Sequence, residues 1–231
     1  ITPVQGTNLA MYDLANVQVL KGPQGTLFGR NSTGGALLFT PQTPGDEFGG
    51  YAEARLGDYN LYHFEGAVDL PASDSLKFRL AGRSLDRDGY QSNVADNALG
   101  GDDKFWDENS WGIRLTARFA PNERFQNLTT IAYDENEMLA RVPTPQAFNS
   151  DAGVGPLMSV VHNGGLNGLF GTPVGKNVDA ALARQRSRDW NDIEVDLRGS
   201  DKIENWFVAN TTEFELLDNL SIKNIVGYRD L

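Results

Sequence analysis

Residues 17–40 read VQVLKGPQGTLFGRNSTGGALLFT, and this stretch decides the fold. Val17 and Val19 form a short β-branched run, which favours a strand, and the Gly22-Pro23 pair ends it. The glycines that follow are Gly25, Gly29, Gly34 and Gly35. Glycine at this density indicates a backbone that bends repeatedly or lies very close to other parts of the chain. Residues 36–40 are apolar and extended again, so the stretch predicts a strand, a glycine-rich turn and a second strand.

The string KGPQGTLFGRNSTGGALLFTPQTP, residues 21–44, resembles the second half of the plug domain of the TonB-dependent outer-membrane receptors. The signature there is an apolar strand, Arg or Lys before Gly-Pro, then Tyr-Gly-Arg or similar, Gly-Gly, a strand and a Thr…Pro exit. The match is unbroken from Val17 to Pro44, and one departure is Phe28, where tyrosine is common. The resemblance implies an all-β dominated fold, part of a plug followed by antiparallel strands of a transmembrane β-barrel. That barrel has about 22 strands in the full-length family.

Composition excludes several classes of protein. The chain has 231 residues, a net charge of −11 and no cysteine. No run approaches eighteen apolar residues, which excludes a helical membrane span, whereas barrel strands alternate and leave a weak hydropathy signal. The lack of cysteine excludes disulfide frameworks and thiol chemistry. The acidity argues against nucleic acid as a partner. His63 and His162 have no second ligand at close spacing, so neither a metal site nor a cofactor is expected.

Residues 40–46 hold two prolines and a glycine and mark the best boundary in the chain. They predict a C-terminal part of a plug domain at 1–44 and an N-terminal part of a β-barrel at 45–231. Residues 11–15 are expected to form one helical turn before the first strand. About seven barrel strands are expected from the alternating pattern: 50–57, 61–70, 75–84, 110–119, 125–134, 206–216 and 221–231.

Each of these strands has an apolar and a polar face. In 110–119, for example, Trp111, Ile113 and Leu115 alternate with Arg114 and Thr116. A polar face that points inward needs water or a polar plug beside it, and one that points outward belongs to a soluble sheet; the pattern leaves both open. After the first hairpin the connections run short, long, short, very long, short, which is typical of barrels with short periplasmic turns. Several strand-end aromatics lie either in interfacial girdles or in an ordinary sandwich core: Trp106, Trp111, Trp190, Trp206 and Tyr228.

Two acidic features have alternative interpretations. Residues 86–108 carry seven acids, either a solvated loop or a cell-surface loop that concentrates cations. Asp192, Glu194 and Asp196 alternate along one face, where they either bind a hard cation or are simply solvated.

The resemblance also implies roles for the opening stretch. The plug motif comprises Gly22, Pro23, Gly25, Gly29, Arg30, Gly34 and Gly35, of which the glycines and the proline shape turns. Arg30 lies inside the lumen, where it either pairs with carboxylates, Glu53 or Glu65 on the barrel wall, or reaches water. Phe28 and Arg30 are the candidate ligand-facing residues, and Phe28 can stack against a ligand but cannot donate a hydrogen bond.

No catalytic constellation is visible. Neither a phosphate-binding Gly-Lys-Ser/Thr nor a G-x-S-x-G elbow is present, so the chain is not expected to be an enzyme. The resemblance implies a TonB-dependent active transport receptor for a scarce nutrient, foremost an iron–siderophore complex, in the outer membrane of a Gram-negative bacterium. Its partners would be the transported iron chelate, outer-membrane lipid and TonB, which acts through an upstream box absent from this partial chain. The alternatives are a soluble β-sandwich ligand-binding module and a β-rich secreted enzyme.

Overall fold

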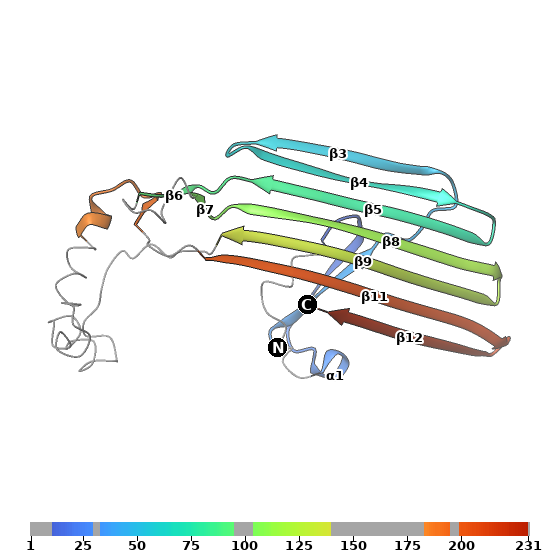
Figure 1. Ribbon diagram of the computed structural model, residues 1–231. Helices are drawn as coiled ribbons and strands as arrows, with labels where there is room; N and C mark the ends of the chain where they lie inside the picture. The colour runs from blue at the N-terminus through green and yellow to red at the C-terminus, as the bar shows by residue number, and fades with distance from the viewer. Residues whose placement is uncertain (1–10, 30–32, 95–103, 140–182, 195–198, 231) are drawn as a thin grey trace. The chain divides into compact units, whose positions relative to one another are not determined.

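The computed structural model describes residues 11–29, 33–94, 104–139, 183–194 and 199–230 (Figure 1). The chain divides into two compact units. One comprises Ile1–Arg87, Glu108–Glu137 and Asp201–Leu231, and the other Asp88–Asp107 and Met138–Ser200. Within the described ranges, no helix has the length and apolar character needed to cross a membrane.

The first unit contains a seven-stranded sheet in the order β12-β11-β9-β8-β5-β4-β3. Strands β3, β4, β5, β8 and β9 pair antiparallel in that succession, as do β11 and β12 (Figure 1). All seven predicted strands are present, and β8, β9 and β11 are longer than the alternation indicates. Their bounds are β3 Gly49–Gly57, β4 Leu61–Pro71, β5 Leu76–Arg87, β8 Glu108–Asn122, β9 Phe125–Leu139, β11 Ser200–Leu217 and β12 Leu220–Asp230.

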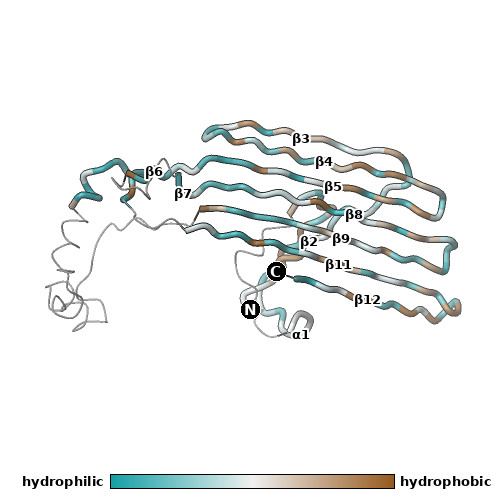
Figure 2. The backbone as a smooth tube through the Cα atoms, viewed as in Figure 1, coloured by the Kyte–Doolittle hydropathy of each residue, from teal (hydrophilic) through white to brown (hydrophobic). Residues whose placement is uncertain are grey.

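The polar face of this sheet is the covered one. On β8, the side chains of Trp111, Ile113 and Leu115 are 42%, 45% and 41% exposed, whereas Arg114 and Thr116 between and after them are 3% exposed. Figure 2 shows the same alternation of hydrophobic and hydrophilic residues along the strands. We call the polar side the inner face and the apolar side the outer face. The alternating pattern does not decide the direction of the polar faces, and the structure turns them inward.

The glycine-rich stretch at residues 17–40 lies in a hairpin. Strand β1 (Leu14–Lys21) pairs antiparallel with β2 (Gly35–Pro41), and the four-residue helix α1 (Gly25–Phe28) lies between them. The predicted strand–turn–strand is confirmed. The predicted helical turn at 11–15 is wrong, because β1 already begins at Leu14 and Asp13 has a left-handed φ of 50°.

The second unit joins the two long connections of the sheet. Strand β6 (Gln91–Asn93) pairs antiparallel with β7 (Lys104–Phe105) and parallel with β10 (Asp192–Ile193). Tyr90 stacks on Trp106 and Trp190, with ring centroids 5.9 and 6.1 Å apart. These two tryptophans therefore belong to a folded cluster of the connections, next to the short strands β7 and β10, and their place in an interfacial girdle stays a prediction.

Candidate functional site

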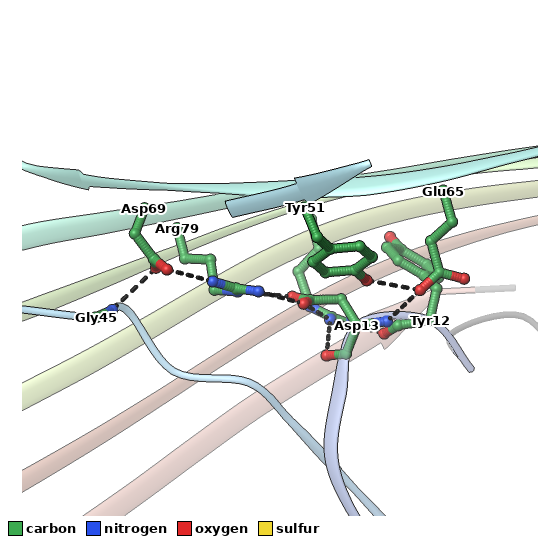
Figure 3. Close-up of polar contacts among 8 residues, drawn as sticks. Tyr12, Asp13, Gly45, Tyr51, Glu65, Asp69 and Arg79 are labelled. Atoms are coloured by element: carbon green, nitrogen blue, oxygen red, sulfur yellow. Dashed lines mark hydrogen bonds and ion pairs between the residues drawn. The ribbon is translucent and has the colours of Figure 1, made fainter. Parts of the chain in front are cut away.

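The β1–β2 hairpin is attached to the inner face of the sheet at both of its ends. Tyr12 and Asp13, just before β1, form what we call the N-terminal anchor. Gly45 and Asp46, just after β2, form the C-terminal anchor. The contacts of both anchors on the sheet come from β4, β5 and β8, which places one polar site where the hairpin meets the sheet (Figure 3).

Asp13 is the centre of the N-terminal anchor. Its carboxylate accepts two hydrogen bonds from Arg79, Nε to Oδ2 at 2.9 Å and Nη2 to Oδ1 at 2.6 Å. Arg114 Nη2 lies 3.3 Å from the same Oδ2 and also donates to the backbone carbonyls of Tyr12 and Asp13, at 2.9 and 2.8 Å. The three side chains are between 3% and 8% exposed. A bidentate pair removed from water in this way is strong and geometrically specific.

Arg79 and Arg114 are matched by two carboxylates. Arg79 also donates to Asp69 Oδ2, and Asp69 Oδ1 accepts the backbone N–H of Gly45 at 2.9 Å, so Arg79 links the two anchors (Figure 3). Two guanidinium groups thus face two carboxylates, Asp13 and Asp69. Buried charges are tolerated when they are paired and hydrogen-bonded, and removal of one partner leaves a costly uncompensated charge.

Tyr12 fills the space beside these ions. Its side chain is 1% exposed, and the guanidinium carbons of Arg114 and Arg83 lie 4.7 and 5.7 Å from its ring centroid. Burial, together with the nearby Asp134 carboxylate, raises the pKa of the Tyr12 phenol well above its usual range. The ring therefore stays neutral and presents its negative face to the two cations.

Two substitutions of Tyr12 separate its ring from its hydroxyl. Among the described residues the phenol oxygen has no hydrogen-bond partner, so Tyr12→Phe is expected to leave the stability of the unit unchanged or slightly raised. Tyr12→Leu keeps an apolar side chain but removes the aromatic face, and is expected to cost about 1–2 kcal/mol. Thermal denaturation of the two variants measures the difference, and equal melting temperatures would contradict the cation–π assignment.

Glu65 and Glu53, the predicted partners of Arg30, have different roles here. Glu65 Oε1 accepts the backbone N–H of Asp13 at 3.1 Å and the hydroxyl of Tyr51 at 2.6 Å, so it does meet the hairpin (Figure 3). Glu53 forms an ion pair with Arg55 on the same strand. Arg30 and the side chain of Phe28 lie outside the described residues, and their pairing and ligand-facing roles stay predictions.

The predicted plug glycines differ in their backbones. Gly22, Gly29 and Gly35 have φ values of 86°, 78° and 141°, which side chains rarely adopt. A Cβ atom at Gly35 would also lie 2.4 Å from the carbonyl oxygen of Leu20. Gly25 and Gly34 have no atom within 4 Å of an added Cβ. Pro23 lies exposed after Gly22.

The C-terminal anchor is more exposed than the N-terminal one. Asp46 pairs with Lys77 and, at 3.0 Å, with Arg118, while its own side chain is 70% exposed. The hydrogen bond from Lys77 holds the pKa of the Asp46 carboxyl below its usual range. Screening by water makes such a pair weak, so the tighter hold on the hairpin is at Asp13.

Glu194, in the middle of the acidic run at 192–196, is paired with cations of the chain itself. Glu194 accepts from Arg184 at 3.2 Å and from Arg188, which lower the pKa of its carboxyl. Asp196 lies outside the described residues. In the ranges that the structure describes, no group of three or more His, Cys, Asp or Glu side chains could hold a metal ion.

Comparison with known proteins supports the same architecture. Over 115 residues the chain is 29% identical to the pesticin receptor of Yersinia pestis, a match that covers 50% of this chain and 17% of that receptor. The solved ferric yersiniabactin uptake receptor FyuA from Yersinia pestis superposes on 94% of this chain and 28% of its own, with a TM-score of 0.67 and 15% identity. The ferric-catecholate import receptor Fiu from E. coli K12 has the same coverages and identity, with a TM-score of 0.62. No family model matches the chain.

The fold is that of the TonB-dependent outer-membrane receptors, as the opening stretch predicts. The assignment of the hairpin to a plug and of the seven-stranded sheet to a barrel stays a prediction. The chain spans less than a third of the length of these receptors. The proteins that share its fold are receptors for transport rather than enzymes.

Proposed function

We propose that this chain is part of a TonB-dependent receptor that imports a ferric siderophore complex across the outer membrane of a Gram-negative bacterium. The observation that carries the proposal is the inverted polarity of the sheet. Apolar side chains such as Ile113 and Leu115 face outward, and Arg79 and Arg114 face the hairpin. A wall with this polarity fits a barrel that stands in lipid and encloses a polar plug.

The lengths of the strands support a membrane location. The seven strands have between 9 and 18 residues, and a tilted strand needs about 9–11 to cross the hydrocarbon core. The soluble β-sandwich is disfavoured because its covered face would be apolar. A β-rich secreted enzyme would need a catalytic constellation, and neither the sequence nor the anchor site offers one.

The cargo and the energy source are inferred from the relatives. The pesticin receptor, the ferric yersiniabactin receptor and the ferric-catecholate receptor point to iron chelates as the ligand class. In this proposal the anchors hold the plug in the closed barrel, and TonB supplies the work that displaces it. Ligand binding alone can shift the equilibrium between the seated and the displaced plug only by the difference in its affinity for these two states.

Uptake of radioactive iron tests the proposal. The full-length receptor is expressed in an iron-limited Gram-negative strain that lacks its own ferric-siderophore receptors, and phenolate, catecholate and hydroxamate chelates are supplied in turn. We expect uptake with one of these classes and none in a matched strain without TonB. The proposal would be overturned if uptake persists without TonB, or if none of the three classes of ferric chelate is taken up.

A further inference from the structure

Four polar side chains form a closed hydrogen-bonded ring between β9 and β11. Asn127 Nδ2 donates to Thr212 Oγ1 at 2.7 Å and to Asn210 Oδ1 at 3.2 Å. Asn210 Nδ2 donates to Thr129 Oγ1 at 2.8 Å and to Asn127 Oδ1 at 3.2 Å. The hydroxyls of Thr129 and Thr212 donate to the amide oxygens of the asparagines on their own strands, at 3.0 and 3.1 Å. We call these four residues the amide ring.

The hydrogen-bonding groups of the two asparagines are all paired within the amide ring. Each asparagine has two N–H donors and a carbonyl oxygen with two acceptor positions, and each threonine hydroxyl donates once. All of these donors and both acceptor positions of each amide oxygen are used within the ring. The ring therefore offers no further donor to an outside partner, and it is not a docking surface for one.

The amide ring lies on the outer, apolar face of the sheet. Thr129 is the cross-strand partner of Ala117, and Asn127 is the partner of Phe119, which share the face of Leu115 and Trp111. Aromatic contacts lie on either side of it along the same two strands, Tyr133 with Trp206 at 4.8 Å and Phe125 with Phe214 at 6.2 Å between ring centroids. Polar groups surrounded by apolar neighbours on a lipid-facing surface are costly unless they are fully paired.

The strands that the ring joins are the two whose connection is longest. Only residues 123–124 separate β8 from β9, and 218–219 separate β11 from β12, so these turns fix the register of their hairpins. Between β9 and β11 lie residues 140–199, and a connection of that length does not specify register. A slip of two residues keeps every side chain on its face, so the apolar pattern alone does not prevent it.

We propose that the amide ring sets the register of β9 against β11 within the membrane wall. A two-residue slip in one direction moves Asn127 from Thr212 toward Phe214. A slip in the other direction moves Thr129 from Asn210 toward Val208. Either slip leaves amide or hydroxyl groups unpaired against apolar side chains, so only the native register satisfies the ring. The inference rests on the proposed membrane location, and it parallels the single buried asparagine that fixes register in coiled coils.

Cysteine cross-linking reads the register directly, because the chain has no cysteine of its own. In the full-length receptor, Ile131→Cys with Val208→Cys reports the native register, and Ile131→Cys with Trp206→Cys reports a slipped one. Directly opposite residues can form a disulfide, whereas the diagonal ones are too far apart. Both pairs are placed in the wild-type background, in Asn210→Leu and in Asn127→Leu/Asn210→Leu.

Asn224→Leu is the matched control. Asn224 is the cross-strand partner of Thr212, which puts it on the same outer face of the next strand, and it has no bond to the ring. The wild type and this control should cross-link in the native register alone. In Asn127→Leu/Asn210→Leu we expect the preference for the native pair over the slipped pair to fall by about tenfold, as the loss of one to two membrane side-chain hydrogen bonds implies. Asn210→Leu should give less folded protein than the double variant, because it leaves one N–H donor and one acceptor position of Asn127 without partners in lipid.

Two results would overturn the proposal. One is an unchanged preference for the native pair among the folded, protease-resistant molecules of the double variant. The other is an equal loss of preference in Asn224→Leu. Neither readout involves iron uptake, so the cross-linking still tests the ring if the receptor carries a different cargo. The membrane location is tested separately: release of the protein from membranes by high salt would refute it.

Discussion

Asp13→Ala is expected to free the plug from the wall. The substitution removes the one carboxylate that Arg79 and Arg114 share, and leaves a guanidinium group buried without its counter-charge. Breaking a buried pair in this way typically costs about 3–5 kcal/mol. In planar bilayers, the reconstituted full-length receptor should conduct ions through an opened lumen more often than the wild type, and cells should become sensitive to bulky antibiotics.

A second substitution should restore part of the loss. In Asp13→Ala/Arg114→Met the remaining Arg79 still pairs with Asp69, so no uncompensated charge stays at the wall. Asp218→Ala is the matched control, since Asp218 pairs with Arg124 at 3.1 Å but is 95% exposed. An exposed pair of this kind is worth about 0.5 kcal/mol or less. Equal conductance in Asp13→Ala and Asp218→Ala would contradict the anchoring role of Asp13.

Gly35→Ala is expected to disrupt the hairpin, whereas Gly34→Ala is not. At Gly35 the backbone φ of 141° is unfavourable for alanine, and the new Cβ would lie 2.4 Å from the carbonyl oxygen of Leu20. Because that oxygen belongs to the backbone, β1 and β2 must separate, at a cost of about 3 kcal/mol. At Gly34 no atom lies within 4 Å of an added Cβ, and the cost should stay below about 1 kcal/mol.

Hydrogen exchange of the β1 backbone amides measures this difference. Local opening that becomes easier by about 3 kcal/mol should raise their exchange rates by about a hundredfold in Gly35→Ala. Gly34→Ala serves as the neighbouring control, with rates close to those of the wild type. Similar rates in the two variants would mean that the hairpin tolerates a side chain at Gly35.

The sequence predicts the strands of the seven-stranded sheet well, because the signals for them lie in short windows of sequence. Alternation along each strand and the turn residues between strands are visible within windows of about ten residues. The three longest strands exceeded their predicted ends because polar positions such as Ser200 and Asp201 break the alternation while the strand pairing continues. The direction of the polar face required the structure, since an alternating pattern is the same whichever side is covered.

Most of the anchor site cannot be predicted from the sequence. The alternation places Arg79 and Arg114 on a polar face, but their shared partner Asp13 lies 66 and 101 residues away in the chain. Asp13 carries no local signature, and its left-handed backbone accompanies the contacts that hold its side chain and its N–H. Gly34 and Gly35 look equivalent in the sequence, and only the position of the Leu20 carbonyl separates them.

The two anchors lie at opposite ends of the hairpin along the chain, and this order has a mechanical consequence. A pulling force applied upstream of Tyr12 reaches Asp13 before it reaches β1, β2 or Gly45. The load is therefore carried in series, and the buried ion pairs to Arg79 and Arg114 bear it first. Once they rupture, the force passes through the base of the hairpin, where the backbone N–H of Gln42 donates to the carbonyl oxygen of Asp13 at 3.0 Å, to the exposed contacts of Asp46, which are weaker. The first rupture should thus set the peak force, and extraction should proceed from there without a second barrier of equal height.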